Sequence, residues 1–413
     1  MPHSYTKKNG SSFKPDPSRF LFNVDTLYYS CLPKNYDQVM NDWLLQELSE
    51  GRELAEKFTE SKRTISLKLP KYENELLFEI EGKGKTAYSY QIRNQDFAFY
   101  FARRSDNDNY PIFVHINQFK LWQLGVIEAY MESLEIIALL GFVIETCKPS
   151  RIDLCCHTDQ FQFTITDLQK HFKTPPNTKK NGLWGVDFDS LSFETVAFGN
   201  RSNYQIRIYN KSSELMVKQK YHFLQVYEEY GLTNNVWNIE FELSRKFLKN
   251  IEVNGEKNFF DDMDNLLSEK GLSILWTELT TNKFKMLKSK EKADSPLLPL
   301  WKVLASGNKG KNGKSVFFQT NEYMSRVKEI DDSLPRELKQ ITGRYKKFAK
   351  NEPIPEGVEP LNFAMTRYYK MILEEHPELI KKFAEEVKKE QSLYVDQDIN
   401  KLIKKEPQTT PNS

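Results

Sequence analysis

Three things are scarce in this sequence, and each scarcity removes a class of protein. Only four of the 413 residues are cysteine, so the disulfide framework of a small secreted domain is not implied. The net charge is only +2, so any affinity for nucleic acid must come from local clusters of basic residues. Long apolar runs are also missing, because the longest, at 134–144, is too short to span a bilayer. We therefore expect a soluble, cytoplasmic protein.

The composition is that of a globular chain, with 39% hydrophobic and 28% charged residues. Its length is sufficient for two domains, or for one large domain with appendages. Residues 1–18 are rich in Lys, Ser, Gly and Pro, which predicts a disordered leader rather than a signal peptide. A loose boundary is expected near 290–296. The main domain would then cover 19–290, and 291–413 would form a mainly helical, basic extension that contacts DNA or a partner.

Short alternating runs predict a series of β-strands in the first part of the chain. They lie at 20–30, 64–69, 75–80, 88–92, 97–101 and 111–116. Helical spacing predicts helices at 36–61 and at 117–145, and Pro149 is expected to mark the end of the second. Strands that follow one another so closely favour an antiparallel sheet with hairpins. The predicted fold class is therefore α+β, a central antiparallel sheet flanked by helices.

The stretch 194–211 predicts a β-hairpin with its turn at 199–202. Because side chains alternate across a strand, Arg207, Tyr209 and Lys211 share one face of the second strand. A tyrosine hydroxyl between a guanidinium and an ammonium is placed to meet an anion. The two cations would also favour the phenolate, which is the nucleophilic form of tyrosine.

Two further strands, at 150–159 and 236–244, also carry a charged face over an apolar face. If these strands are neighbours of 203–211, their polar side chains form one surface that includes Asp153, His157, Glu240 and Glu242. Carboxylates with an imidazole suit a divalent cation such as Mg²⁺ or Mn²⁺. The alternative is a solvated sheet face without a catalytic role, which is common in antiparallel sheets.

Other chemical motifs are incomplete. Cys155, Cys156 and His157 make a poor zinc motif, because adjacent cysteines in a strand point apart and no second pair follows. The glycine- and lysine-rich loop at 307–315 has Asn308 where a phosphate-binding loop needs its first glycine. The lysine-rich segment 283–292, which includes Lys285 and Lys288, is either a solvated helix face or a surface for nucleic acid.

Taken together, three motifs resemble the replication initiation factor family of rolling-circle plasmids, phages and integrative conjugative elements. They are SRIDLCCHTD, ETVAFGNRSNYQIRIYNKSSE and WNIEFELSR, in the family's order within residues 20–260. The middle motif is the most specific, since it holds the family's Gly, Arg, Ser, Arg, Tyr, Lys and Glu. The resemblance implies a fold related to the HUH endonucleases and a metal-dependent nicking-closing reaction on DNA.

The resemblance also implies a role for each matching residue. Tyr209 would attack a DNA phosphodiester and stay joined to the 5′ phosphate, leaving a free 3′ hydroxyl, while Arg207 and Lys211 bind the scissile phosphate. Arg201 and Ser202 would contact DNA at the turn. Mg²⁺ or Mn²⁺ would be held by a set of four candidate ligands, namely Asp153, His157, Glu240 and Glu194.

The expected partner is origin DNA, as a single strand or as a cruciform or supercoiled duplex, with stacking by Tyr204 or Phe198. A host helicase and a second copy of the chain are further candidate partners. The sequence departs from the family pattern at His157, where the family often has aspartate, and at Asn238, where it often has arginine. These departures motivate a rival, a non-catalytic DNA-binding protein on the same fold. A conjugative relaxase is a second alternative.

Overall fold

The computed structural model describes residues 14–324, except for 58–61, 106–109, 187–190, 219, 221, 233–234, 293, 307–316 and 318–319, together with scattered helical positions between 366 and 385. The chain divides into two compact units, Met1–Met324 and Ser325–Ser413. The boundary between them therefore lies beyond the predicted 290–296. The basic loop 307–315 lies outside the described residues.

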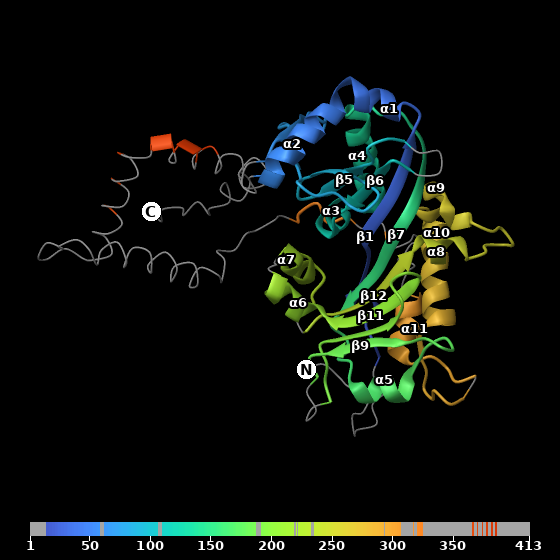
Figure 1. Ribbon diagram of the computed structural model, residues 1–413. Coiled ribbons are helices and arrows are strands. Elements are labelled where there is room, and N and C mark those ends of the chain that lie inside the picture. Colours follow the sequence, from blue (N-terminus) through green and yellow to red (C-terminus); the bar gives the residue numbers. More distant parts are fainter. Residues whose placement is uncertain are drawn as a thin grey trace, which may run out of the picture. The chain divides into compact units, whose positions relative to one another are not determined.

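The first unit is built on an antiparallel sheet of 11 strands, in the order β2-β3-β4-β5-β6-β1-β7-β12-β11-β10-β9. Its centre is the long pair β1 and β7, which runs through most of the unit (Figure 1). The strands are β1 (Phe20–Pro33), β2 (Thr64–Leu67), β3 (Leu76–Ile80), β4 (Tyr90–Arg93), β5 (Phe97–Phe101), β6 (Ile112–Ile116), β7 (Ile144–Thr158), β9 (Lys180–Trp184), β10 (Thr195–Gly199), β11 (Tyr204–Asn210) and β12 (Trp237–Ser244). A separate two-stranded sheet joins β8 (Phe172–Lys173) to β13 (Lys285–Met286).

Helices cover both faces of this sheet. Figure 1 shows α6 and α7 on one side of β11 and β12, with α8, α10 and α11 on the other. No helix in the described part of the chain is long and apolar enough to cross a membrane. The helices are α1 (Tyr36–Val39), α2 (Leu45–Lys57), α3 (Gln118–Leu124), α4 (Val126–Leu139), α5 (Ile165–His171), α6 (Lys211–Lys218), α7 (His222–Glu229), α8 (Arg245–Lys249), α9 (Met263–Leu266), α10 (Glu269–Thr277) and α11 (Pro299–Ser306), with short 3₁₀ or π segments at Pro17–Arg19, Met40–Leu44, Phe259–Asp261 and Glu278–Lys283. The predicted α+β class, a large antiparallel sheet flanked by helices, is confirmed.

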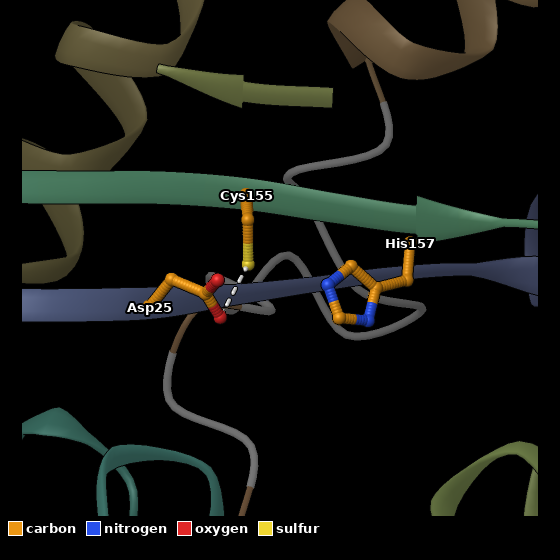
Figure 2. A group of neighbouring side chains, drawn as sticks. All are labelled: Asp25, Cys155 and His157. Atoms are coloured by element: carbon orange, nitrogen blue, oxygen red, sulfur yellow. Dashed lines mark hydrogen bonds between the residues drawn. The ribbon is translucent and has the colours of Figure 1, made fainter. Parts of the chain in front are cut away.

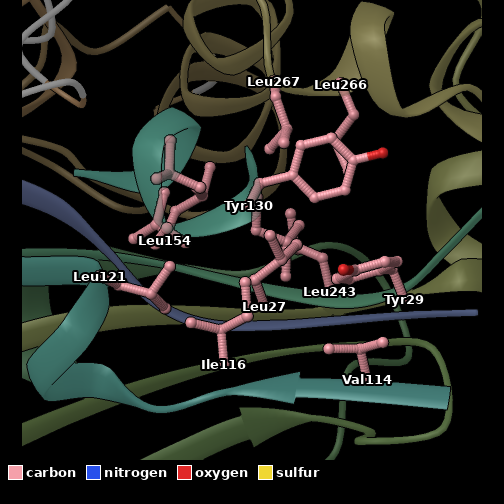
Figure 3. Packing of buried hydrophobic residues seen from close by; sticks show 14 of the residues in the cluster. Leu27, Tyr29, Val114, Ile116, Leu121, Tyr130, Leu154, Leu243, Leu266 and Leu267 are labelled. Carbon is pink, nitrogen blue, oxygen red and sulfur yellow. The ribbon is translucent and has the colours of Figure 1, made fainter. Parts of the chain in front are cut away.

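The main hydrophobic core lies on one face of the sheet. Alternate residues of the central strands supply it, among them Leu27, Ile116 and Leu154, which are fully buried (Figure 3). Burying a side chain of this size contributes about 1.5–3 kcal/mol. Trp301 of α11 belongs to the same core, so this helix is part of the first unit although it follows residue 290.

The predicted helix at 117–145 is wrong in its length and in its end. Gly125, at a φ of 80°, divides it into α3 and α4, because a positive φ is readily adopted only by glycine. The helix then stops at Leu139, and β7 begins at Ile144. Pro149 consequently lies inside a strand, at an irregularity in the pairing with β1, which is where a sheet tolerates proline.

Candidate active site

The three strands that were predicted to share a charged surface are adjacent. In the register of β11, β12 and β7, Arg207 lies opposite Glu240, and Glu240 lies opposite Cys155. Tyr209 lies opposite Asn238, which lies opposite His157. Directly opposed residues point to the same face, so the polar side chains of all three strands meet on the face away from the main core.

A fourth strand adds a carboxylate that the sequence interpretation did not include. In the pairing of β1 with β7, Val24 faces Leu154 and Thr26 faces Asp153, which leaves Asp25 as the extra residue of a β-bulge. A bulge re-aims a side chain and is frequent beside active sites. Oδ1 of Asp25 accepts a hydrogen bond from the Trp122 indole at 2.7 Å, so the carboxylate points into the charged cluster.

The hydroxyl of Tyr209 is the centre of a hydrogen-bonded group. It donates to Oε2 of Glu240 at 2.9 Å. It accepts from the Lys211 ammonium at 3.2 Å and from the Asn238 amide at 2.8 Å. Lys211 is the first residue of α6 rather than the last of the strand, yet it reaches the same hydroxyl. One carboxylate acceptor and two donors therefore surround this phenol oxygen.

A ladder of ion pairs extends from this group along the sheet. Arg207 pairs with Glu240 and places Nε 2.6 Å from Oε1 of Glu242. Arg151 reaches Oε2 of Glu242 at 3.0 Å and binds both oxygens of Asp153, at 2.7 and 2.6 Å. The carboxylates are 1–2% exposed, so they need these partners, because a buried charge without one is costly.

The Tyr209 end of this charged face is covered, unlike a solvated sheet face, whereas Arg151 and Arg207 further along remain about 30% exposed. Tyr209 is only 7% exposed, and Lys211 and His157 are fully buried. Above them lies a second, smaller hydrophobic cluster contributed by α3, α6 and α7, including Trp122, Leu215, Phe223, Val226 and Tyr227. A substrate can reach the Tyr209 hydroxyl only when part of this cover moves.

The buried setting controls the protonation of the site. Burial, followed by Glu240, Asp25 and Glu214, raises the pKa of Tyr209 well above its usual 10.0. The expectation that neighbouring cations favour the phenolate is therefore wrong, since Arg207 opposes this rise only in part. Burial also lowers the pKa of Lys211, but the nearby carboxylates outweigh it and raise that pKa overall. The site thus holds a phenol and an ammonium at neutral pH.

The same buried surroundings shift the pKa values of His157 and Asp153. Burial, with a contribution from Lys211, lowers the pKa of His157 well below 6.5, so its imidazole is neutral. Burial raises the pKa of Asp153 to about 7, with help from Glu240 and Glu242 and against the opposing effect of Arg151.

Three donors of different strands could hold a metal ion. Donor atoms of Asp25, Cys155 and His157 all lie within 4.8 Å of one another (Figure 2). The buried Nε2 of His157 has no hydrogen-bond partner among the described residues, whereas its Nδ1 lies 3.0 Å from the Tyr227 hydroxyl. A ligand imidazole is usually held at its second nitrogen in this way. The donor set of one carboxylate, one thiol and one imidazole fits Zn²⁺ better than Mg²⁺.

The predicted ligands are not brought together as one set. His157 belongs to the candidate metal cluster, but Asp153 is bound by Arg151, and Glu240 is shared by Arg207, Tyr209 and Asn238. Glu194 is exposed and lies immediately before β10, outside the cluster. The only predicted ligand with a free donor atom facing other donors within the described residues is therefore His157.

The predicted DNA contacts lie in two places. Arg201 and Ser202 are exposed in the turn between β10 and β11, and Arg201 lies 3.4 Å from Oε2 of Glu242, at one end of the ion-pair ladder. Lys285 is on β13 and Lys288 follows it. Because β13 packs through Met286 into the main core, these lysines belong to the opposite side of the sheet from Tyr209.

The expected stacking residues are also on the core side. Phe198 packs against Phe172, and Tyr204 packs against Phe247 and Phe284. Their rings are committed to the protein's own core, so the expectation that they stack on DNA bases is wrong.

Comparisons with known proteins do not assign this chain to a family. No family profile matches the sequence, and no curated protein matches it. Among solved structures, the chain is similar to a rolling circle replication initiator protein from Geobacillus stearothermophilus, with 17% identity over 70% of this chain and 96% of that chain. The TM-score is 0.36, which is too low to support a conclusion about activity.

Proposed function

We propose that this protein is a DNA nicking-closing enzyme that initiates rolling-circle replication by forming a 5′-phosphotyrosine at Tyr209. The observation that carries the proposal is the position of the Tyr209 hydroxyl, between the acceptor Glu240 and the donors Lys211 and Asn238. Tyr209 is also the tyrosine of the sequence motif that resembles the replication initiation factors.

The geometry supports a base-assisted attack by the phenol, with no preformed phenolate. As Tyr209 attacks, its proton passes to Oε2 of Glu240, which already accepts the hydrogen bond. The bond from the tyrosine oxygen to phosphorus forms, and the bond from phosphorus to the 3′ oxygen breaks. That oxygen takes a proton from the Lys211 ammonium or from water and leaves as a 3′ hydroxyl.

Positive charge close to the reacting group supports the same chemistry. Lys211 lies 3.2 Å from the hydroxyl, and the Arg207 guanidinium lies 5.4 Å from the centre of the Tyr209 ring. Fixed cations stabilise the charge that builds on a phosphoryl group in the transition state, and they act strongly where water is excluded. Arg207 and Lys211 are thus the proposed phosphate-binding residues.

The proposed metal site is Asp25, Cys155 and His157. A bound ion would supply Lewis-acid stabilisation of a phosphoryl oxygen. The Cys155 thiol must lose its proton to bind an ion, and burial raises the pKa of this thiol well above its usual 9.0. Binding must therefore offset the loss of this proton. A thiolate with an imidazole favours Zn²⁺ over the Mg²⁺ or Mn²⁺ of the sequence-based expectation.

The burial of Tyr209 favours a second candidate, a DNA-binding protein without nicking activity. A phenol under a hydrophobic cover, with every polar contact satisfied, is also the arrangement of a stable core. A relaxase of a conjugative element would use the same chemistry as the replication initiator. A host helicase, a homodimer and a cytoplasmic location remain predictions.

The experiment that tests the proposal is a nicking assay on a supercoiled plasmid that carries DNA from around the protein's own gene. Mg²⁺, Mn²⁺ and Zn²⁺ are supplied separately, and a chelator serves as the metal-free arm. We expect relaxed circles and a protein–DNA adduct that survives denaturant. Tyr209→Phe is expected to form neither product. Tyr29→Phe is the matched control, because this buried tyrosine bonds to Ser133 within the main core, away from the site. Tight, salt-sensitive binding without relaxed circles under any condition would favour the non-catalytic candidate.

A further inference from the structure

A group of aromatic side chains lies on the same sheet face, beyond the ion-pair ladder. Tyr28 of β1 lies opposite His115 of β6, and Phe113 of β6 lies opposite Tyr100 of β5. The Tyr28 ring centre is 4.4 Å from that of His115 and 5.7 Å from that of Phe113, and Tyr100 and Phe113 are 5.6 Å apart. We call these four residues the aromatic surface.

A lysine stands over this surface. The Lys85 ammonium lies 4.0 Å from the ring centre of Phe113, 4.2 Å from that of Tyr100 and 5.3 Å from that of Tyr28. Lys85 is exposed and forms no ion pair within the described residues. Its charge is therefore available to an anion. Besides Lys85, the Phe113 ring also meets the ring of Tyr88, with the ring centres 5.6 Å apart.

In this half of the sheet the hydrophobic core lies on the opposite face, so the aromatic surface is not part of it. The helices α2 and α4 contact strands β3, β4 and β6. They pack on the other face, where Ile80 and Val114 are fully buried. Tyr28, Phe113 and His115 are partly buried, and Tyr100 is 7% exposed. The rings that remain partly accessible on this face are therefore those of Tyr28, Phe113 and His115.

The aromatic surface is continuous with the proposed active site. The guanidinium of Arg151 lies 5.5 Å from the ring centre of Tyr28 and pairs with Glu242, which also pairs with Arg207. Arg207 in turn lies over the ring of Tyr209. Tyr28 lies opposite Arg151 of β7, and Tyr209 lies level with His157 of β7. These two positions of β7 are about 20 Å apart along the strand, at about 3.3 Å per residue.

We propose that the aromatic surface binds unpaired bases of the DNA strand whose phosphate reaches Tyr209. This inference rests on the proposed function. Single-strand binding combines aromatic rings on which bases stack with cations that follow the backbone, and both are present here. Lys85 covers the rings in the structure described here, and it moves from ring to phosphate when a base takes its place.

The test measures the affinity for a fluorescent single-stranded oligonucleotide and maps cross-links from the same oligonucleotide carrying iodouracil. Phe113→Ala is expected to weaken binding by about 5- to 100-fold, the range typical of one lost stacking partner. Lys85→Glu, at an exposed turn position, is expected to weaken binding and to reduce its salt dependence by about one phosphate contact. Cross-links are expected on Tyr28, Tyr100 or Phe113.

Trp43→Ala is the matched control, because this aromatic is 39% exposed but lies in the helical segment before α2. Unchanged affinity in both surface variants, with a Tyr209 adduct still formed, would overturn this inference while the proposed function stands. Loss of DNA binding and adduct in the unmodified protein would overturn both. A dimer that dissociates in Lys85→Glu, with affinity for DNA unchanged, would assign the surface to a second copy of the chain and contradict the proposal.

Discussion

One face of the sheet carries two different surfaces. On β7, β12 and β11 the side chains are charged, and around Tyr209 they lie beneath α3, α6 and α7. On β1, β5 and β6 they are aromatic, with Tyr28 and Phe113 partly buried and Tyr100 buried. Buried charges are stable only with partners, so the first surface is a connected set of ion pairs whose members depend on one another. The aromatic surface has no such requirement, and Tyr28 and Phe113 stay partly accessible beside Lys85. In the proposed account, the first surface carries out the chemistry and the second binds DNA bases.

The largest effect is expected at the nucleophile. Tyr209→Phe should reduce adduct formation by about 10⁴-fold or more, because the variant lacks the proposed attacking oxygen. Binding of single-stranded DNA should change little, since the aromatic surface is intact. Nicking rates and equilibrium affinity, measured on the same preparation, check this. A variant that loses affinity as much as activity would break the distinction between the two surfaces.

The two surfaces should also differ in how much their side chains contribute to the stability of the fold. Glu240→Gln should lower the free energy of unfolding by about 1.5–3 kcal/mol, because Arg207 would keep only Glu242 and the buried Tyr209 hydroxyl would lose a charged acceptor. Lys85→Ala should lower it by only about 0.5–1 kcal/mol, because it removes cation–π contacts at an exposed site and no ion pair. Urea denaturation of both variants measures the difference. Equal losses would show that the charged surface is not specially dependent on its pairs.

The next prediction concerns metal binding at the buried candidate site. Cys155→Ser should weaken binding of Co²⁺, used as a spectroscopic substitute for Zn²⁺, by at least roughly 10- to 100-fold, because losing a direct ligand costs at least as much as losing an outer-shell partner. The thiolate-to-cobalt charge-transfer absorption should disappear with it. Cys156→Ser is the control, because Cys156 points to the core face. Retention of the absorption in Cys155→Ser would exclude this thiol as a ligand.

The smallest effect concerns pH. The pKa of buried His157 lies well below 6.5, so below that pH the unfolded chain binds a proton that the folded protein does not. Its contribution therefore lowers stability as pH falls, by up to about 1.4 kcal/mol per pH unit. Asp153, with a raised pKa of about 7, acts in the opposite direction over the same range.

The comparison of wild type with His157→Asn isolates the histidine effect. Stability should fall less between pH 6.5 and pH 5 in the variant, in denaturation experiments at each pH. Parallel curves for the two proteins would mean that His157 titrates normally when folded, which its full burial argues against.

Much of the charged surface could be predicted from the sequence, because alternation fixes which residues of a strand share a face. Arg207, Tyr209 and Glu240 were identified in this way, and the strand register confirms that they share a face. Asp25 could not be placed, since its orientation depends on a bulge in a strand that precedes β7 by more than 100 residues. An isolated aspartate in an otherwise apolar strand was the available signal.

The hydrophobic cover over the site could not be predicted from the sequence either. Alternation shows that a face is polar, but only tertiary packing decides whether water or a helix lies over it. The hydrogen bonds by which Trp122 and Tyr227 hold Asp25 and His157 in place could therefore not be predicted. The aromatic surface was missed for a related reason, because Lys85, Tyr28 and Phe113 come from separate strands and turns whose pairing is not local.

The measurement that tests the central claim most directly is peptide mapping of the covalent adduct. After reaction with an origin-containing single strand, the protein would be digested with protease and nuclease and analysed by mass spectrometry. The account predicts a nucleotide attached through its 5′ phosphate to Tyr209. Attachment to another tyrosine, such as Tyr227, would contradict the assignment of Tyr209 as the nucleophile. It would also contradict the proposal that the contacts of Glu240, Lys211 and Asn238 with Tyr209 serve catalysis.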